Sequence, residues 1–279
     1  MLIIDKNEIN RSLEMLFPYE LQAHEGIFVS LSCRNKYVSA EERQRYKLTG
    51  TEMFARKVCR KKEDVISWIE RFHFTNGGLD GYYSKSGLPL PVNAMTVYIN
   101  TNPTDGLWVA EETVKYLNNG FCGIIKGDEG QRHKFGKITN VVNTFYQKSR
   151  SKRVWVDVDI DFYDTRRFDV LLELTAVLIK RGVDYFIVET RSGFHVLMKA
   201  DTIKFNYPAV LKILQEKYKD SVKEIEVNKN EMLPLPGTLQ AGHSVYIRPC
   251  PHNKVPEEPV NRNIYAVNDS VPLYNEGGR

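Results

Sequence analysis

The stretch VWVDVDIDF, residues 154–162, alternates apolar side chains with aspartate, and this alternation constrains the fold more than any other feature of the chain. Successive side chains of a β-strand point to opposite faces. One face would therefore be apolar, while the other would carry Trp155, Asp157, Asp159 and Asp161. Like charges on one strand face repel each other, so these acids require either solvent or a cation.

The residues after this strand continue in an orderly pattern. Thr165 can cap a helix whose apolar residues recur at helical spacing until Gly182, a residue type that ends helices. Beyond it, the sequence predicts strands at 184–190 and 194–200, a helix at 207–218 and a strand at 223–228. This βαββαβ order is that of RNA-recognition-type modules and predicts an α+β fold.

In such a module the first strand is central, between the third and fourth strands, and both helices cover one face of the sheet. Asp161 is expected just past the end of the first strand. Alternation in the three central strands would put five polar residues on the other, open face: Asp157, Asp159, His195, Glu226 and Asn228. If this face were only exposed to solvent, nothing would require His195 and Glu226 to point to the same side as the aspartates. The pattern therefore favours a metal site.

The first half of the chain predicts a mixed α/β lobe. Its expected elements are a strand at 26–33, a helix from the capping box Ser39-Ala-Glu-Glu42, a helix at 62–72, a strand at 95–100 and a helix at 106–117. Two glycine-rich segments, 75–91 and 126–136, are expected to be loops, the second of them mobile. The tail after Pro251 is expected to be irregular. We therefore predict two domains, an N-terminal α/β lobe at 1–150 and an RNA-recognition-like module at 151–279.

Composition excludes several classes of protein. No apolar run approaches the roughly 18 residues that span a bilayer, and the N-terminus lacks the pattern of a secretory signal, so a cytoplasmic location is expected. The scattered cysteines, with no C-x-x-C pair, argue against a zinc ribbon and against a secreted disulfide framework: Cys33, Cys59, Cys122 and Cys250.

Positive charge is concentrated in one segment. The net charge is only +4, but residues 34–62 contain ten Lys or Arg and three Glu. Basic segments of this kind bind nucleic-acid phosphates without sequence preference, so this one is a candidate for template contact, with Arg60, Lys61 and Lys62 as its densest part. The alternative interpretation, a charged helix surface exposed to solvent, stays open.

Three motifs resemble those of the archaeo-eukaryotic primase superfamily. VWVDVD, 154–159, is similar to the family's apolar strand followed by Asp-x-Asp. RSGFHV, 191–196, resembles its Ser-Gly turn and histidine, with a shorter turn. IEVNKNEMLPLPGTLQAG, 225–242, is similar to its third acid and the loop that follows, with Glu226 in place of the usual Asp. The resemblance covers about residues 154–247 and implies the primase-polymerase fold.

The resemblance also implies a reaction and a set of site residues. The reaction would be template-dependent nucleotidyl transfer, in which Mg²⁺ or Mn²⁺ stabilises the attacking and leaving oxygens. The implied metal ligands and catalytic residues are Asp157, Asp159 and Glu226, with Asp161 as a substitute or outer ligand. The implied nucleotide-binding residues are His195, Ser192, Arg191, Gln240 and Arg248. For Arg191 and Arg248, a solvated charge at a strand end is an equal alternative.

The expected partners follow from this reaction. They are a nucleic-acid template and primer, nucleoside triphosphates and, because the chain lacks a zinc-binding stem and helicase motifs, a helicase or accessory priming domain on another chain. Such an enzyme would act in DNA replication of a plasmid, phage or other mobile element. Two other functions stay open at this point. One is an RNA-recognition-type module that binds single strands without catalysis, and the other is a two-metal nuclease.

Overall fold

The computed structural model describes residues 2–130, 135, 137–163 and 168–249, and these residues form one compact unit. The helices are α1 (Lys6–Leu16), α2 (Ala40–Tyr46), α3 (Glu63–Ile69), α4 (Gly106–Ile125), α6 (Ile138–Lys148), α7 (Phe168–Lys180) and α8 (Tyr207–Lys217), with short 3₁₀ turns at Asn35–Tyr37, Val92–Ala94 and Ala200–Thr202. The strands of the first half are β1 (Glu25–Arg34), β2 (Thr51–Cys59), β3 (Phe74–Thr75), β4 (Gly78–Tyr83), β5 (Pro89–Pro91), β6 (Met95–Asn100) and β7 (Thr104–Asp105). Those of the second half are β8 (Trp155–Phe162), β9 (Tyr185–Glu189), β10 (Gly193–Lys199), β11 (Val222–Val227), β12 (Met232–Pro234), β13 (Leu239–Gln240), β14 (His243–Ser244) and β15 (Tyr246–Arg248).

Side-chain caps are present at the starts of α1, α2 and α4. The capping box of α2 is formed by Ser39 and Glu42, as predicted. Asp5 accepts hydrogen bonds from the first turn of α1, and Asp105 does the same for α4. Gly182 has a positive φ of 66° just after α7, which explains why that helix ends there. The predicted cap at Thr165 lies outside the described residues.

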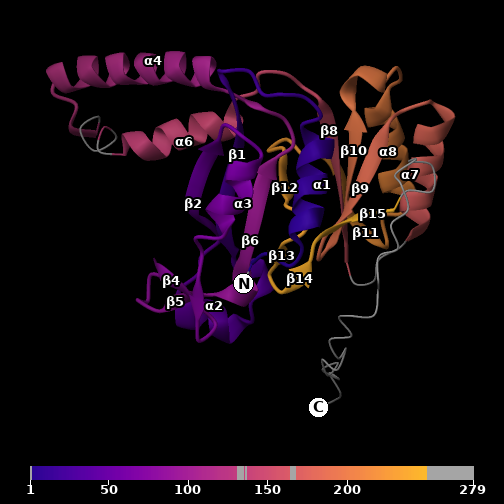
Figure 1. Ribbon diagram of the computed structural model, residues 1–279, viewed down its shortest axis with the longest axis horizontal. Helices are drawn as coiled ribbons and strands as arrows, with labels where there is room; N and C mark the ends of the chain where they lie inside the picture. The colour runs from indigo at the N-terminus through magenta and orange to yellow at the C-terminus, as the bar shows by residue number, and fades with distance from the viewer. Residues whose placement is uncertain (1, 131–134, 136, 164–167, 250–279) are drawn as a thin grey trace. The chain divides into compact units, whose positions relative to one another are not determined.

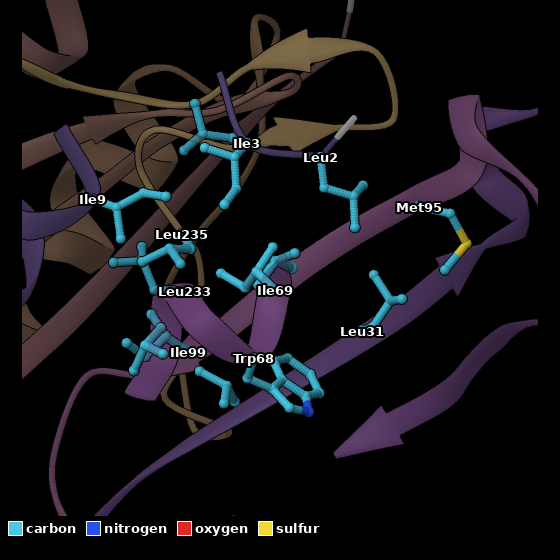
Figure 2. Close-up of a cluster of buried hydrophobic side chains, with 14 of the residues drawn as sticks. Leu2, Ile3, Ile9, Leu31, Trp68, Ile69, Met95, Ile99, Leu233 and Leu235 are labelled. Carbon is cyan, nitrogen blue, oxygen red and sulfur yellow. The ribbon is translucent and has the colours of Figure 1, made fainter. Parts of the chain in front are cut away.

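The first sheet has seven antiparallel strands in the order β14-β13-β6-β1-β2, with β12 also paired to β6 and β7 to β1. Figure 2 shows the apolar face of this sheet, where Leu31, Met95 and Ile99 belong to the same buried cluster as Trp68 and Ile69 of α3. The alternate residues of β1 and β6 therefore point to the opposite face, where Ser30, Ser32, Thr96 and Asn100 lie together with the apolar Phe28.

The second sheet has the strand order predicted from the sequence. Its five antiparallel strands run β11-β8-β10-β9-β15, so β8 lies between the third and fourth strands of the βαββαβ unit. Figure 1 shows α7 and α8 on one side of this sheet and α1 on the other. Phe168 of α7 packs on Phe194 of β10, with ring centroids 5.5 Å apart, on the side of the two helices.

The other face of the second sheet is not open, contrary to expectation. Trp155 is buried and its indole Nε1–H donates to the carbonyl of Leu16, at 2.9 Å, at the end of α1. Phe186, Val188 and Leu197 join the same core as the first sheet and α1. Elements from the first half of the chain thus cover part of this face, because its apolar positions need burial as much as those on the helix side.

Three further expectations are corrected. Part of the segment 75–91, expected to be a loop, forms strands β4 and β5 of a small sheet with the order β3-β4-β5. The basic segment 34–62 includes the strand β2 as well as a short helix. The helix at 106–117 continues to Ile125, and α4 runs alongside α6 (Figure 1), with Trp108 and Phe145 in edge contact.

Strands β12, β13 and β14 come from the second half of the chain but belong to the first sheet. Leu233 and Leu235 are buried in its core (Figure 2), which fastens this segment there. The proposed boundary at residue 150 stays a prediction, and residues 250–279 of the second predicted domain lie outside the described part. Within the described residues, no helix is both long and apolar enough to cross a membrane. Residues 131–134 and 136 of the second predicted loop also lie outside it.

Candidate active site

Three adjacent strands bring acids and a histidine into one row. Asp159 of β8 lies directly opposite His195 of β10 and opposite Glu226 of β11. Directly paired residues of antiparallel strands point to the same face, with Cβ atoms about 5 Å apart. The predicted adjacency of Glu226 and Asp159 is therefore present, and Asp157 shares their face two residues earlier on β8.

Asp157 is the buried anchor of this face. Its side chain has 0% exposure, and His195 Nδ1 lies 3.0 Å from its Oδ1 and 3.1 Å from its Oδ2. Asn228 Nδ2 donates to Asp157 Oδ2 at 2.8 Å, and the Asn228 backbone N–H donates to the Asp157 carbonyl. A carboxylate this deeply buried is stable only when paired and hydrogen-bonded, and these partners meet that requirement.

His195 is held between two carboxylates. Its Nε2 lies 3.6 Å from Asp159 Oδ1, on the opposite side of the ring from Asp157. Burial by itself lowers the pKa of the imidazole, but the charges of Asp157 and Asp159 outweigh it and raise the pKa to about 9. His195 is therefore an imidazolium at neutral pH.

The pKa values of Asp159 and Glu226 are both raised above their ordinary range. Burial raises the pKa of Asp159, and the neighbouring charges of Asp161 and Asp157 raise it further against the opposing effect of His195. Burial and the nearby Glu224 raise the pKa of Glu226 in the same way. A cation bound beside these crowded acids would lower their pKa values and favour their charged forms.

Asp161 lies inside β8, opposite Gly193, and not past the strand end as expected. Ser192 Oγ donates to Asp161 Oδ1 at 2.7 Å, and Lys36 Nζ lies 3.9 Å from Asp161 Oδ2. The Ser-Gly turn is close to β8 because Gly193 has no side chain: a Cβ there would stand 1.7 Å from the Ile160 carbonyl oxygen. Glycine at this position is therefore required by the close approach of two backbones.

Arg191 and Gln240 meet at the edge of the same face. Gln240 Oε1 accepts from the Arg191 backbone N–H at 2.7 Å, and Gln240 Nε2 donates to the hydroxyl of Tyr37 at 3.0 Å. Tyr37 was missed by the sequence analysis, and Lys36 and Arg34 were included only in the basic segment considered for template contact. One indication of Arg34, Lys36 and Tyr37 was present in the sequence: the basic segment begins where a predicted strand ends.

Arg248 does not reach this face, which corrects its expected place beside the nucleotide. It pairs with Ile187 of β9 in register, and its guanidinium lies 4.7 Å from the ring centroid of Phe168 and 5.7 Å from that of Phe194. Both rings are on the side of α7, and Arg248 NH1 lies 3.4 Å from Glu189 Oε2. The alternation of side chains along the sequence could not reveal the position of Arg248, because β15 is a fifth strand that pairs with β9 at the edge of the sheet.

The three basic residues predicted to contact template lie at the end of β2 and the start of α3. Arg60 NH1 donates to the backbone carbonyls of Ala23 and Glu25, so part of its role is structural. Lys62 Nζ lies 2.7 Å from Glu14 Oε2, and Lys61 is exposed. Template contact by this group stays a prediction.

We name the face that carries Asp157, Asp159 and Glu226 the acidic face. Its carboxylates are donors of the type that binds a divalent cation. Among the described residues, no group of three or more His, Cys, Asp and Glu side chains is arranged closely enough to hold a metal ion as the side chains stand. Carboxylates are nevertheless the oxygen donors that Mg²⁺ and Mn²⁺ prefer, and Mg²⁺ binds through only one or two of them. Of the two aspartates, Asp159 is the more accessible to a cation, since 32% of its side chain is exposed. The side chain of Asp157 is fully buried.

No protein-family model, no curated protein and no solved structure matches this chain.

Proposed function

We propose that this chain is a template-dependent nucleotidyltransferase of the primase-polymerase type, which uses the acidic face of the second sheet for two-metal phosphoryl transfer. The observation that carries the proposal is the row formed by Glu226, Asp159 and His195 across three adjacent strands. It combines carboxylates for a cation with an imidazolium for phosphate on one surface. The strand order β11-β8-β10-β9, which carries the first motif on β8, the histidine of the second on β10 and the acid of the third on β11, supports the corresponding fold.

Asp159 and Glu226, together with Asp157, would hold Mg²⁺ or Mn²⁺, which when bound stabilises charge on the attacking and leaving oxygens. The chain's own residues bind and orient the substrate. Asp157 fixes the imidazolium of His195, whose Nε2 lies beside Asp159, and this Nε2–H would donate to a phosphate oxygen that approaches Asp159. Ser192 lies at the turn beside it, and Arg191 adds a second positive charge.

A module that binds single strands without catalysis is less well supported. Such modules stack bases on aromatic side chains of the exposed sheet face. Here Trp155 and Phe186 on that face are buried and in edge contact with each other, with ring centroids 4.9 Å apart. Carboxylates on the rest of the face would repel phosphates in the absence of a cation.

A primer-extension experiment tests the proposal. The full chain is incubated with a primed template, labelled deoxynucleotides or ribonucleotides, and Mn²⁺, and a second reaction contains labelled template without nucleotides. Extension that is lost in Asp159→Asn supports nucleotidyl transfer. Degradation of the template alone would indicate a nuclease, and binding without either reaction would indicate a binding module. Either of these two outcomes contradicts the proposal.

A further inference from the structure

Tyr37 lies at the centre of a group of cations that the sequence analysis did not identify. Lys36 Nζ and Arg191 Cζ are each 5.0 Å from the centroid of its ring, and Arg34 Cζ is 5.6 Å away. We name Arg34, Lys36, Tyr37 and Arg191 the Tyr37 cluster. Cations within about 6 Å of an aromatic ring are attracted to its face, so Tyr37 gathers positive charge from two sheets.

Both parts of the cluster are positioned by their local structure. Arg34 ends β1, and Asn35–Tyr37 form a 3₁₀ turn, in which residues three apart lie above one another. Arg34 and Tyr37 therefore share one side of the turn. Arg191 comes from the turn before β10, and Gln240 fastens it to Tyr37 by accepting from the Arg191 backbone and donating to the phenol oxygen.

The cluster borders the acidic face. Lys36 Nζ lies 3.9 Å from Asp161 Oδ2, and Ser192, the neighbour of Arg191, donates to the other oxygen of the same carboxylate. Both Lys36 and Arg191 are accessible to solvent, Lys36 with 40% of its side chain exposed. A molecule bound at Asp159 and His195 can therefore extend to these cations without passing through the core.

Arg34 and Lys36 place two positive charges beside the carboxylate of Asp161. Arg34 donates to the hydroxyl of Tyr98 at 2.6 Å, but its Nε is buried without a hydrogen-bond partner among the described residues. Burial lowers the pKa of Lys36, and the charge of Arg34 lowers it further. Cations that repel each other and carry an unsatisfied donor are stabilised when an anion binds between them.

We propose that the Tyr37 cluster binds the triphosphate of the incoming nucleotide, so that residues of both sheets hold the substrate together. This inference rests on the proposed function. A triphosphate is favoured over a nucleic-acid strand because it concentrates several negative charges on three linked phosphates, whereas a strand carries one charge per nucleotide. Arg34 and Lys36 are thereby assigned to the nucleotide and not to the template.

Binding measurements on the full chain test this assignment. A nucleoside triphosphate, the corresponding monophosphate and inorganic tripolyphosphate are titrated by calorimetry, and a fluorescent single-stranded oligonucleotide is titrated by anisotropy. The main variant is Lys36→Ala, because Lys36 is exposed enough for the fold to tolerate the change. The matched control is Lys180→Ala, an exposed lysine at the end of α7 on the other side of the sheet.

Lys36→Ala is expected to weaken binding of the triphosphate and tripolyphosphate about ten-fold, the size expected for one charge-assisted contact, and binding of the monophosphate less. Its affinity for the oligonucleotide should not change, and Lys180→Ala should match the wild type throughout. Unchanged triphosphate affinity in Lys36→Ala would overturn the inference, as would a loss confined to the oligonucleotide.

Primer extension separates this failure from that of the proposed function. If the wild type extends primers and Lys36→Ala leaves the KM for nucleotides unchanged, only the role of the cluster is wrong. If the wild type neither extends primers nor binds a triphosphate, both proposals fail. A raised KM with little change in kcat supports the cluster as a binding site for the substrate.

Discussion

His195 Nδ1 lies 3.0 Å from Asp157 Oδ1, and both side chains are almost completely buried. The two residues come from neighbouring strands but are not directly opposite each other, since Asp157 pairs with Leu197 and His195 with Asp159. This diagonal contact lets one imidazole touch two carboxylates. It holds Asp157 in the interior and leaves Asp159 partly exposed, which assigns the two aspartates different roles.

The first prediction concerns the pH dependence of stability. The pKa of His195 is about 9 in the folded protein, against an ordinary value of 6.5. Between these values the folded state binds the proton and the unfolded state releases it, so the free energy of unfolding should fall as the pH rises from about 6.5 to about 9. Urea unfolding across this range, in the presence of EDTA, measures the effect.

In His195→Asn this fall should be much smaller, and the variant should be less stable at pH 6 by about 3–5 kcal/mol, the usual cost of breaking a buried ion pair. Exposed His73 provides a control, because His73→Asn should keep the wild-type slope. Equal slopes for wild type and His195→Asn would show that the imidazole is not held as an ion pair.

The second prediction separates activity from stability at Asp159. Because burial and neighbouring acids raise its pKa, the folded state disfavours its charge. Asp159→Asn should therefore not lower the urea midpoint at pH 7, which should stay equal or rise. The same variant should abolish nucleotide incorporation, because Asp159 is a proposed metal ligand. Asp184→Asn, at an exposed position, is the matched control and should keep full activity. A lower midpoint for Asp159→Asn would mean that the carboxylate is structural.

The third prediction concerns Asn102, a buried amide that joins the first sheet to the second. Its Oδ1 accepts from the backbone N–H groups of Val154 and Trp155, and its Nδ2 donates to the Trp155 carbonyl and to Glu231. Asn102→Ala leaves these buried groups unsatisfied and should lower the free energy of unfolding by about 2–4 kcal/mol. The amide of Asn93 donates to Glu42 near the surface, so Asn93→Ala should cost about 1 kcal/mol or less. Similar losses for both would contradict the role of Asn102.

The fourth prediction tests template contact by the basic residues at the start of α3. Lys61 is the cleanest site, since Arg60 supports the backbone and Lys62 pairs with Glu14. If Lys61 neutralises a template phosphate, Lys61→Glu should weaken binding of a primed template and reduce the slope of log affinity against log salt by about 1. Nucleotide affinity should not change. A wild-type salt slope would remove Lys61 from the template surface.

The fifth prediction follows from the position of Arg248 on the helix side of the second sheet. Arg248→Ala should leave the KM for nucleotides unchanged, because the guanidinium contacts Phe168 and Glu189 and does not reach the acidic face. Stability should fall by about 1–2 kcal/mol through loss of the cation–π contact and the ion pair. A large rise in KM with normal stability would place Arg248 in the nucleotide site after all.

The second sheet is the part of the fold that the sequence predicts best. Period-two alternation in β8, β10 and β11 and the helical spacing of α7 and α8 are local patterns, and together with the βαββαβ order they predicted which strands are neighbours. The acidic row follows from the same parity. The prediction was wrong where the local pattern is compatible with both a turn and a short strand. The glycine-rich segment that forms β4 and β5 is the example.

The sequence by itself therefore determined the order of the elements and the face on which Asp157, Asp159, His195 and Glu226 lie. Only the tertiary structure decided what covers that face and what borders it. Trp155 is buried against α1, β12–β14 return to the first sheet, and Tyr37 lies beside Arg191. These contacts join residues far apart in the chain, and they are chosen by burial of apolar surface and by charge, for which no local period exists.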